Sequence, residues 1–160
     1  MPVLVTRSAP RSPAVSRAEI RALGERMLVA LGLEGAELSV TLVDDPRIRE
    51  LNQRFRGKDR PTDVLSWPMD DAGPEGAPRL LGDVVISLDT ADRQARGRRR
   101  PLLDEVRFLL AHGLLHLVGH DHAEPEEKRR MVRETRRLVR ASRGPGGGAQ
   151  ASHSASRKPR

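Results

Sequence analysis

The sequence predicts a single small α+β domain, with one mixed sheet of the α/β type and helices packed on it. Apolar residues recur at every second position in some short segments, and at every third or fourth position in longer ones. These segments follow one another in the order β-α-β-α-β-β-α-α-α, a mixture typical of one sheet covered by helices. The chain has 160 residues, enough for one domain with its own core.

The first half of the chain contains two predicted strands and two predicted helices. Residues 2–6 are expected to form a short strand, and a capping-box pattern at 16–19 begins a helix that ends at Gly32. Residues 37–43 alternate between apolar and polar side chains and predict a second strand. An Asp-Pro pair at 45–46 then opens a second, shorter helix.

The second half contains two further strands and three helices. Residues 62–67 predict a strand, and the near-continuous apolar run within 80–88 is typical of an inner strand. A short helix is expected over 90–96. A largely buried helix begins at Pro101, and acidic residues at the start of 124–140 suit the N-terminus of the last helix.

The remainder of the chain is basic. The folded domain is expected over residues 1–142, whereas 143–160 predict a disordered basic tail rich in Gly and Ser. The net charge of +7 favours a polyanionic partner, first of all nucleic acid, but a solvated surface with a disordered tail explains it equally well. Two Phe and one Trp are too few for an aromatic stacking platform of the OB-fold or RRM kind.

Composition also limits the chemistry and the compartment. The chain has no cysteine, which excludes disulfides and thiolate metal ligands. No apolar run is long enough to span a membrane, and the first residues lack the apolar centre of a signal peptide. We therefore expect a soluble cytoplasmic protein without a membrane partner.

Four of the five histidines fall within residues 112–122. His112 and His116 are four residues apart, which places them on one face of a helix. Gly119 can end that helix in a left-handed conformation, so that His122 returns toward the same face. Three imidazoles around Zn²⁺ leave one tetrahedral position open for water, the arrangement of a catalytic site on a buried helix and its exit turn.

The spacing of these histidines matches the metal ligands of metzincin peptidases, but the catalytic base of such enzymes is absent. Peptidases of the H-E-x-x-H type have Glu after the first histidine, and this chain has Gly113 there. His120 is expected to point outward from the turn. Asp121 could hold an imidazole N–H beside the ligands or cap the following helix.

Three segments of the chain resemble the YbeY family of bacterial endoribonucleases. Residues 112–122 read His-Gly-x-x-His-Leu-x-Gly-x-Asp-His, and 51–68 contain Phe-Arg-Gly-Lys-Asp-Arg-Pro-Thr-Asp-Val-Leu-Ser-Trp-Pro. Leu-Gly-Asp-Val-Val-Ile-Ser at 81–87 is similar to the inner strand of that family. The resemblance covers residues 36–140. His120 and Trp67 depart from it, standing where the family usually has an aromatic residue and phenylalanine.

The resemblance implies a function and a set of site residues. It implies that His112, His116 and His122 bind one divalent metal, usually taken as zinc, and that Arg56 is the functional arginine beside it. The implied activity is metal-dependent cleavage of single-stranded RNA in ribosomal RNA processing, at the 3′ end of 16S rRNA, and in ribosome quality control. The implied partners are ribosomal RNA and the small subunit or proteins associated with it.

The chemistry of the individual side chains agrees with these implied roles but leaves alternative roles open for several residues. A guanidinium at Arg56 suits a phosphodiester, although an ordinary surface ion pair with Asp59 or Asp63 would also explain it. Asp63 and Ser66 could line the cleft, while Asp after Thr is also a common turn residue. The proton acceptor could be Asp121, a chain of waters or the 2′-OH of the substrate. Basic residues expected to bind the RNA backbone are Arg54, Lys58, Arg60 and the cluster 93–100.

Two other functions compete with the nuclease. A zinc peptidase fits the ligand spacing but lacks the glutamate at position 113. A ribosome-associated assembly factor with a structural metal fits the small size and basic charge, although structural zinc usually has four protein ligands and three are evident here. The sequence does not indicate an oligomeric state.

Overall fold

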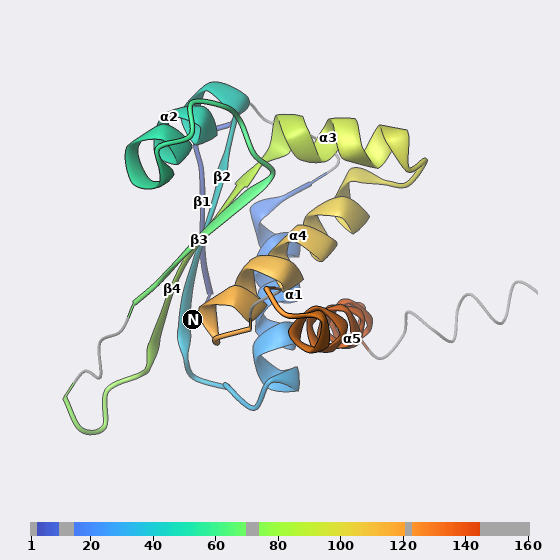
Figure 1. The fold of residues 1–160 in the computed structure, drawn as a ribbon. Helices are drawn as coiled ribbons and strands as arrows, with labels where there is room; N and C mark the ends of the chain where they lie inside the picture. Colours follow the sequence, from blue (N-terminus) through green and yellow to red (C-terminus); the bar gives the residue numbers. More distant parts are fainter. Residues whose placement is uncertain (1–2, 10–14, 70–73, 121–122, 145–160) are drawn as a thin grey trace, which may run out of the picture.

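A computed structural model describes residues 3–9, 15–69, 74–120 and 123–144, and these form a four-stranded sheet with five helices packed around it (Figure 1). The order of elements is the predicted one, and the predicted class, a mixed α/β single domain, is confirmed. The elements are β1 Val3–Arg7, α1 Arg17–Ala30, β2 Glu37–Val43, α2 Asp45–Arg56, β3 Val64–Pro68, β4 Leu80–Ser87, α3 Leu88–Gly97, α4 Leu102–Leu117 and α5 Pro125–Ser142.

The sheet has the order β1-β2-β4-β3. β1, β2 and β4 are parallel, whereas β3 lies antiparallel to β4 at one edge. A register shift at the start of β2 pairs Glu37 with Leu80 but Leu38 with Gly82. Gly82 has φ +132°, and a Cβ there would lie 2.1 Å from the carbonyl oxygen of Trp67, so only glycine fits this irregularity.

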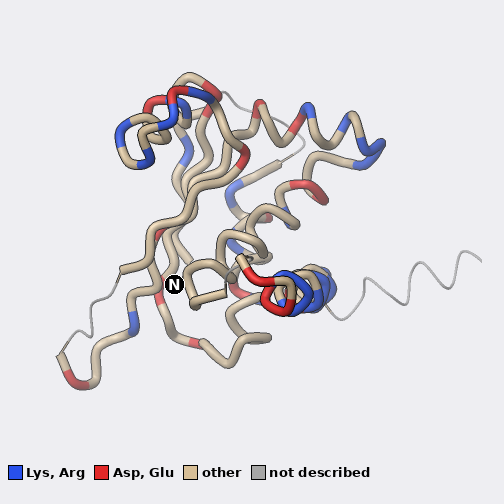
Figure 2. The backbone as a smooth tube through the Cα atoms, in the orientation of Figure 1, with Lys and Arg blue, Asp and Glu red and all other residues tan. Residues whose placement is uncertain are grey.

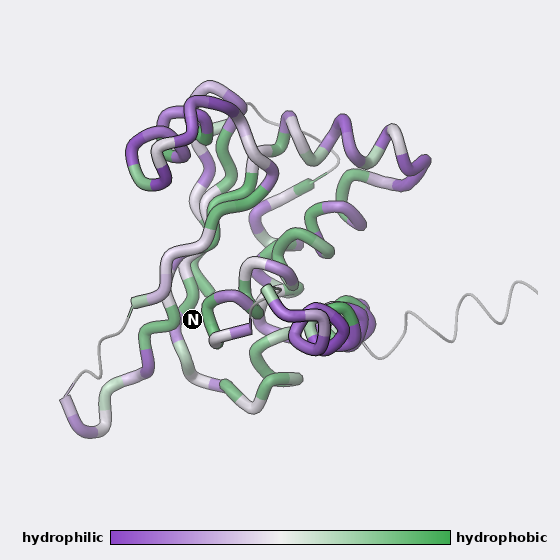
Figure 3. The backbone as a smooth tube through the Cα atoms, viewed as in Figure 1, coloured by the Kyte–Doolittle hydropathy of each residue, from purple (hydrophilic) through white to green (hydrophobic). Residues whose placement is uncertain are grey.

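The two faces of the sheet carry cores of different size. The main core lies between one face and helices α1, α4 and α5, and α4 runs through its centre as the most apolar helix (Figure 3). On the opposite face α2 covers a small cluster. Members of the main core include Val5, Met27, Val40, Ile86, Leu110, Leu114 and Leu138, and those of the small cluster are Val43, Ile48, Leu65 and Val85.

Hydrogen bonds fix the last turn of α5 against two earlier helices. The Arg26 guanidinium on α1 donates to the carbonyl oxygen of Ser142 at 2.9 Å. From α4, the buried Arg107 donates to the Ser142 hydroxyl at 2.8 Å. Arg137 of α5 also donates to the carbonyl oxygen of Ala30 at the end of α1. The α1–α5 contact is therefore held at both helices by arginine donors.

Helix ends follow the expected local chemistry with one difference. The capping box of Ser16 and Glu19 is formed, each side chain accepting from the other residue's backbone N–H. Pro101, expected as the first helical residue, is instead the N-cap of α4, and its carbonyl oxygen accepts from Asp104. No helix among the described residues is long and apolar enough to cross a membrane.

Candidate functional site

Helix α4 places two of the predicted metal ligands side by side. His112 and His116 are half-buried, while most of the other residues in their half of the helix are fully buried. Their Nε2 atoms lie 3.2 Å apart, and their ring centroids are separated by 4.8 Å. The apolar face of α4 therefore fixes the backbone of both histidines and leaves one edge of each ring at the surface of a cleft.

The spacing of these two nitrogens fits a shared metal ion. Two ligand nitrogens at about 2.0–2.1 Å from a tetrahedral Zn²⁺ are separated by about 3.3 Å, close to the observed 3.2 Å. Gly119 has φ +99°, as expected for a left-handed exit from the helix, and the neighbouring His120 is half-buried rather than fully outward.

The rest of the predicted metal site lies outside the described residues. His122, the third predicted ligand, and Asp121 are both in the gap at 121–122. Within the part of the chain that the structure describes, no group of three His, Cys, Asp or Glu side chains could hold a metal ion. Two ligands of the proposed set of three can thus be placed, and their geometry agrees with metal binding.

A cleft of about 520 Å³ brings the described site residues together. It lies along the edge strand β3, between the C-terminal end of α2 and the face of α4 that carries the histidines. The residues expected to bind phosphate or line the site, Arg56, Asp63 and Ser66, border this cleft together with both histidines. The remaining lining residues are Phe55, Thr62, Val64, Leu65, Trp67 and Gly113.

Arg56 is the last residue of α2 and is exposed at the mouth of the cleft. The helix ends there because Gly57 adopts φ +68°. Neither ion pair considered for Arg56 is formed. Asp59 instead pairs with Arg49 at 2.8 Å, and Asp63 accepts from the Gln94 side chain at 3.2 Å. No carboxylate of the described residues lies within 4.0 Å of Arg56, which leaves its guanidinium available for a ligand.

A buried asparagine, not singled out in the sequence, holds the loop after Arg56. Asn52 is 1% exposed, and its side-chain amide donates to the carbonyl oxygen of Arg60 at 2.8 Å. Arg49 of α2 also pairs with Asp59 at 2.8 Å and so holds the same loop from outside. The hydrogen bond and charge of Arg49 lower the pKa of Asp59. A polar residue on the apolar stripe of Ile48 was the available signal for this role.

Gly113 has a packing role that its sequence position did not reveal. A Cβ at this position would lie 2.8 Å from Cγ1 of Val84 and 3.2 Å from Cγ2 of Val64. The glycine therefore allows α4 to approach β3 and β4 closely. A glutamate here would push the helix away from the sheet, so the absent peptidase base could not be restored without moving the histidines.

The basic residues expected to bind an RNA backbone fall into two groups. Arg54, Lys58 and Arg60 are exposed around the end of α2, and no carboxylate of the described residues lies within 4.0 Å of them. In the cluster 93–100 most arginines are already paired: Arg93 with Asp45, Arg96 with Asp92, and both Arg98 and Arg100 with the buried Glu105. Figure 2 shows blue and red side by side along α3. The α2 group is therefore the freer of the two.

Comparisons with known proteins match most of the chain. The family model described as Endoribonuclease YbeY matches residues 11–143. A relative named Endoribonuclease YbeY from Anaeromyxobacter sp. (strain Fw109-5) is 50% identical over 141 residues, covering 88% of this chain and 72% of the relative. Another of that name, from Aquifex aeolicus (strain VF5), is 49% identical over 126 residues, covering 78% and 82%.

A similar fold is found in a solution structure. A Thermotoga maritima protein matches 98% of this chain and 97% of its own, with a TM-score of 0.62 and 24% sequence identity. This likeness concerns the arrangement of strands and helices only.

Proposed function

The chain belongs to the YbeY family, and from this premise we propose that it is a metal-dependent endoribonuclease acting on single-stranded RNA. The same premise supports a place in ribosomal RNA processing, at the 3′ end of 16S rRNA, and in ribosome quality control. Ribosomal RNA and the small subunit with its associated proteins are the proposed partners, and the cytoplasm is the proposed compartment. Zn²⁺ is the proposed metal.

One observation carries the proposal: a single cleft holds the two histidines of α4 and the guanidinium of Arg56, which no carboxylate of the described residues pairs. The imidazoles of His112 and His116 would hold the metal, with His122 as the third ligand. When bound, the metal supplies Lewis-acid chemistry for hydrolysis of a phosphodiester. Arg56 would bind the phosphate through two parallel N–H donors and neutralise the charge that develops on it.

Other cleft residues orient the substrate. Both oxygens of Asp63 accept hydrogen bonds, Oδ1 from the backbone N–H of Val64 and Oδ2 from Gln94, so this carboxylate has a fixed direction. Its negative charge, in the same cleft as Arg56, would repel the phosphates of the RNA and keep them away from the Asp63 side of the cleft. A peptidase is not favoured, because Gly113 packs on Val84 and has no room for the required base.

The test is cleavage of fluorescently labelled single-stranded RNA by zinc-loaded protein, compared with His116→Ala and Arg56→Glu. We expect loss of at least about 10³-fold for His116→Ala, because a metal ligand is removed. For Arg56→Glu we expect about 10²–10³-fold, typical of losing a donor to developing charge. Arg130→Glu, on the exposed side of α5, is the matched charge control and should cleave as wild type does.

Two results would contradict the proposal. Equal cleavage by the wild type and both site variants would mean that the activity comes from elsewhere. Zinc bound at one ion per chain without any cleavage would favour the assembly factor with a structural metal.

A further inference from the structure

A second and larger cavity meets the reaction cleft at His112. This groove, of about 780 Å³, runs between α4 and α5, and His112 lines both it and the cleft. Its floor is apolar and includes Phe108, Met131 and Val139. The centroid of the Phe108 ring lies 6.3 Å from that of the His112 ring, with 27° between the ring planes, so an apolar surface continues from the histidine pair into the groove.

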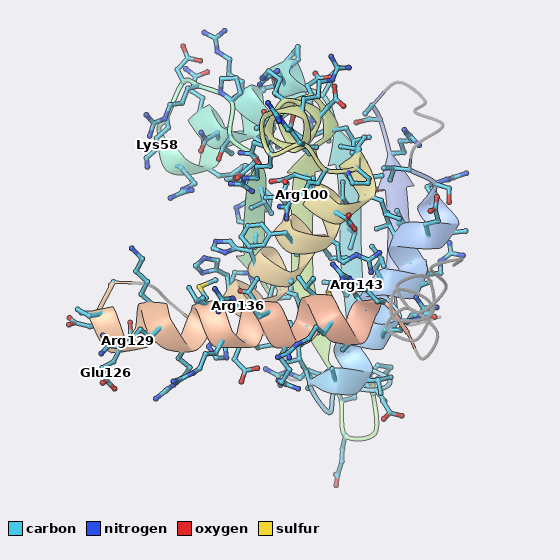
Figure 4. The ribbon with its side chains drawn as sticks, turned by 90° about the vertical axis from the view of Figure 1, so that its right-hand side faces the viewer. Lys58, Arg100, Glu126, Arg129, Arg136 and Arg143 are labelled. Carbon is cyan, nitrogen blue, oxygen red and sulfur yellow. The ribbon has the colours of Figure 1, made fainter. Side chains whose placement is uncertain are left out.

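The rim of the groove is basic without any acid among its lining residues. Five cations line it: Arg100, Lys128, Arg136, Arg140 and Arg143. Figure 4 looks onto this face of the molecule, with Arg136 and Arg143 along the edge of α5 nearest α4 and Arg100 across from them. Arg100 is paired with Glu105, so an anionic ligand would meet positive charge mainly on the α5 side of the groove.

Three cations of α5 that line the groove are not paired with a carboxylate of the described residues. Away from it, Arg129 pairs with Glu126 at 3.2 Å, and Arg137 pairs with Glu134 at 2.8 Å. By contrast, Lys128, Arg136 and Arg140 have no carboxylate of the described residues within 4.0 Å. Arg130 and Arg133, which do not line the groove, also have no carboxylate of the described residues within 4.0 Å, so what distinguishes the groove is five cations around an apolar floor with no acid among its lining residues.

We propose that this groove binds single-stranded RNA, receiving the part of the strand that flanks the scissile phosphate in the cleft. The proposal rests on the proposed nuclease function, because His112 is common to both cavities. Phosphates would lie along the arginines of the rim, while the apolar floor, with Val132 44% exposed, would take the faces of bases. An acidic peptide would leave the apolar floor without a matching partner.

The test measures RNA binding with the metal removed by chelator, so that binding is read without cleavage. Two RNAs are compared, one of about 16 nucleotides and one of about 4 that spans only the cleft. For Arg136→Ala/Arg140→Ala we expect the long RNA to bind about tenfold more weakly. The logarithm of the binding constant falls with the logarithm of the salt concentration, and the magnitude of this slope should decrease by about 1.4, or about 0.7 for each phosphate that is no longer neutralised. The short RNA should be bound as by wild type and, in a separate assay with zinc restored, cleaved as by wild type.

The control is Arg130→Ala, an exposed arginine of the same helix that lines neither cavity. Arg136 and Arg140 are exposed, so circular dichroism and the melting temperature should stay unchanged in all variants. Equal loss in the control, or none in the double variant while cleavage persists, would overturn the groove proposal alone. Arginine-dependent binding without cleavage by wild type would overturn the nuclease proposal alone. Equal competition by polyglutamate would assign the groove to an acidic peptide and overturn the RNA proposal.

Discussion

The two helices that supply the site, α4 and α2, are held in the domain by different forces. Of the sixteen residues of α4, ten are buried, among them Leu110 and Leu114. Of the twelve residues of α2, only Ile48 and Asn52 are buried. The histidines therefore stand on a helix fixed by the main core, whereas Arg56 stands on one fixed by a small cluster and a few polar contacts.

Because of this difference, substitutions in the two helices should affect the stability of the domain and its activity to different degrees. Substitutions that disturb α4 should lower the free energy of unfolding, because they act on the main core. Substitutions near the end of α2 should change the position of Arg56 at a smaller cost in stability. Three predictions sharpen this comparison.

The largest effect on stability is expected for Gly113→Ala. The new methyl group would lie 2.8 Å from Val84, so α4 or β4 must shift. We expect a loss of about 1–3 kcal/mol, typical of overpacking, and a melting temperature lower by roughly 2–4 °C for each kcal/mol. Thermal unfolding followed by circular dichroism measures both. Gly97→Ala is the matched control, since nothing lies within 4 Å of its added Cβ, and an equal loss there would refute the packing role.

An intermediate effect is expected for Asn52→Ala on α2. The variant loses the hydrogen bond to Arg60, worth about 1 kcal/mol in urea unfolding. The loop after Arg56 loses its anchor, so cleavage of single-stranded RNA should fall about tenfold, more than the loss of stability explains. Gln53→Ala, at an exposed neighbouring position, should change neither quantity. A full loss of stability with unchanged cleavage would remove the link between the loop and Arg56.

The smallest effect is expected at the N-terminal end of α2. Burial alone would raise the pKa of Asp45, but hydrogen bonds from Ser87, Thr90 and Arg93 outweigh it and lower the pKa. The ionised carboxylate therefore stabilises the fold above its unfolded pKa of about 3.9, and this contribution disappears as the pH falls through the lower folded value.

Comparison of wild type with Asp45→Asn tests this assignment. The variant should be less stable at pH 7 by below about 1 kcal/mol, since Arg93 is exposed and water screens its charge. The difference should vanish in urea titrations at the lowest pH that keeps the fold. Glu50→Gln, which removes an exposed pair with Arg47, should show almost no pH-dependent difference. A difference that grows on acidification would contradict the lowered pKa.

The order of elements could be predicted from the sequence, whereas the order of strands could not. Periodicity and caps are local, and the capping box at Ser16 is formed as predicted. The antiparallel edge strand β3 and the irregularity at Gly82 depend on contacts between segments far apart in sequence. The φ of Gly82 is required only because the backbone of Trp67 passes beside it.

The candidate site, too, could be predicted only in part from the sequence. The spacing of His112 and His116 is a property of one helix, and the sequence therefore predicted their proximity. The availability of the Arg56 guanidinium was not predictable, because it depends on Asp59 pairing with Arg49. The groove beside His112 was also not predictable, since its walls depend on how α5 packs against α4. The roles of the site residues and the metal remain predictions, which the cleavage assay addresses.

The contacts of Ser142 determine when the molecule can be completed during synthesis. Arg26 donates to the carbonyl oxygen of Ser142 and Arg107 to its hydroxyl, so neither hydrogen bond can form before the last turn of α5 has been synthesised. A nascent chain thus leaves the parts of α1 and α4 that pack against α5 uncovered until α5 has left the ribosome. The wall of the groove is also the final part to arrive. A partly made chain would therefore lack the proposed strand-binding surface.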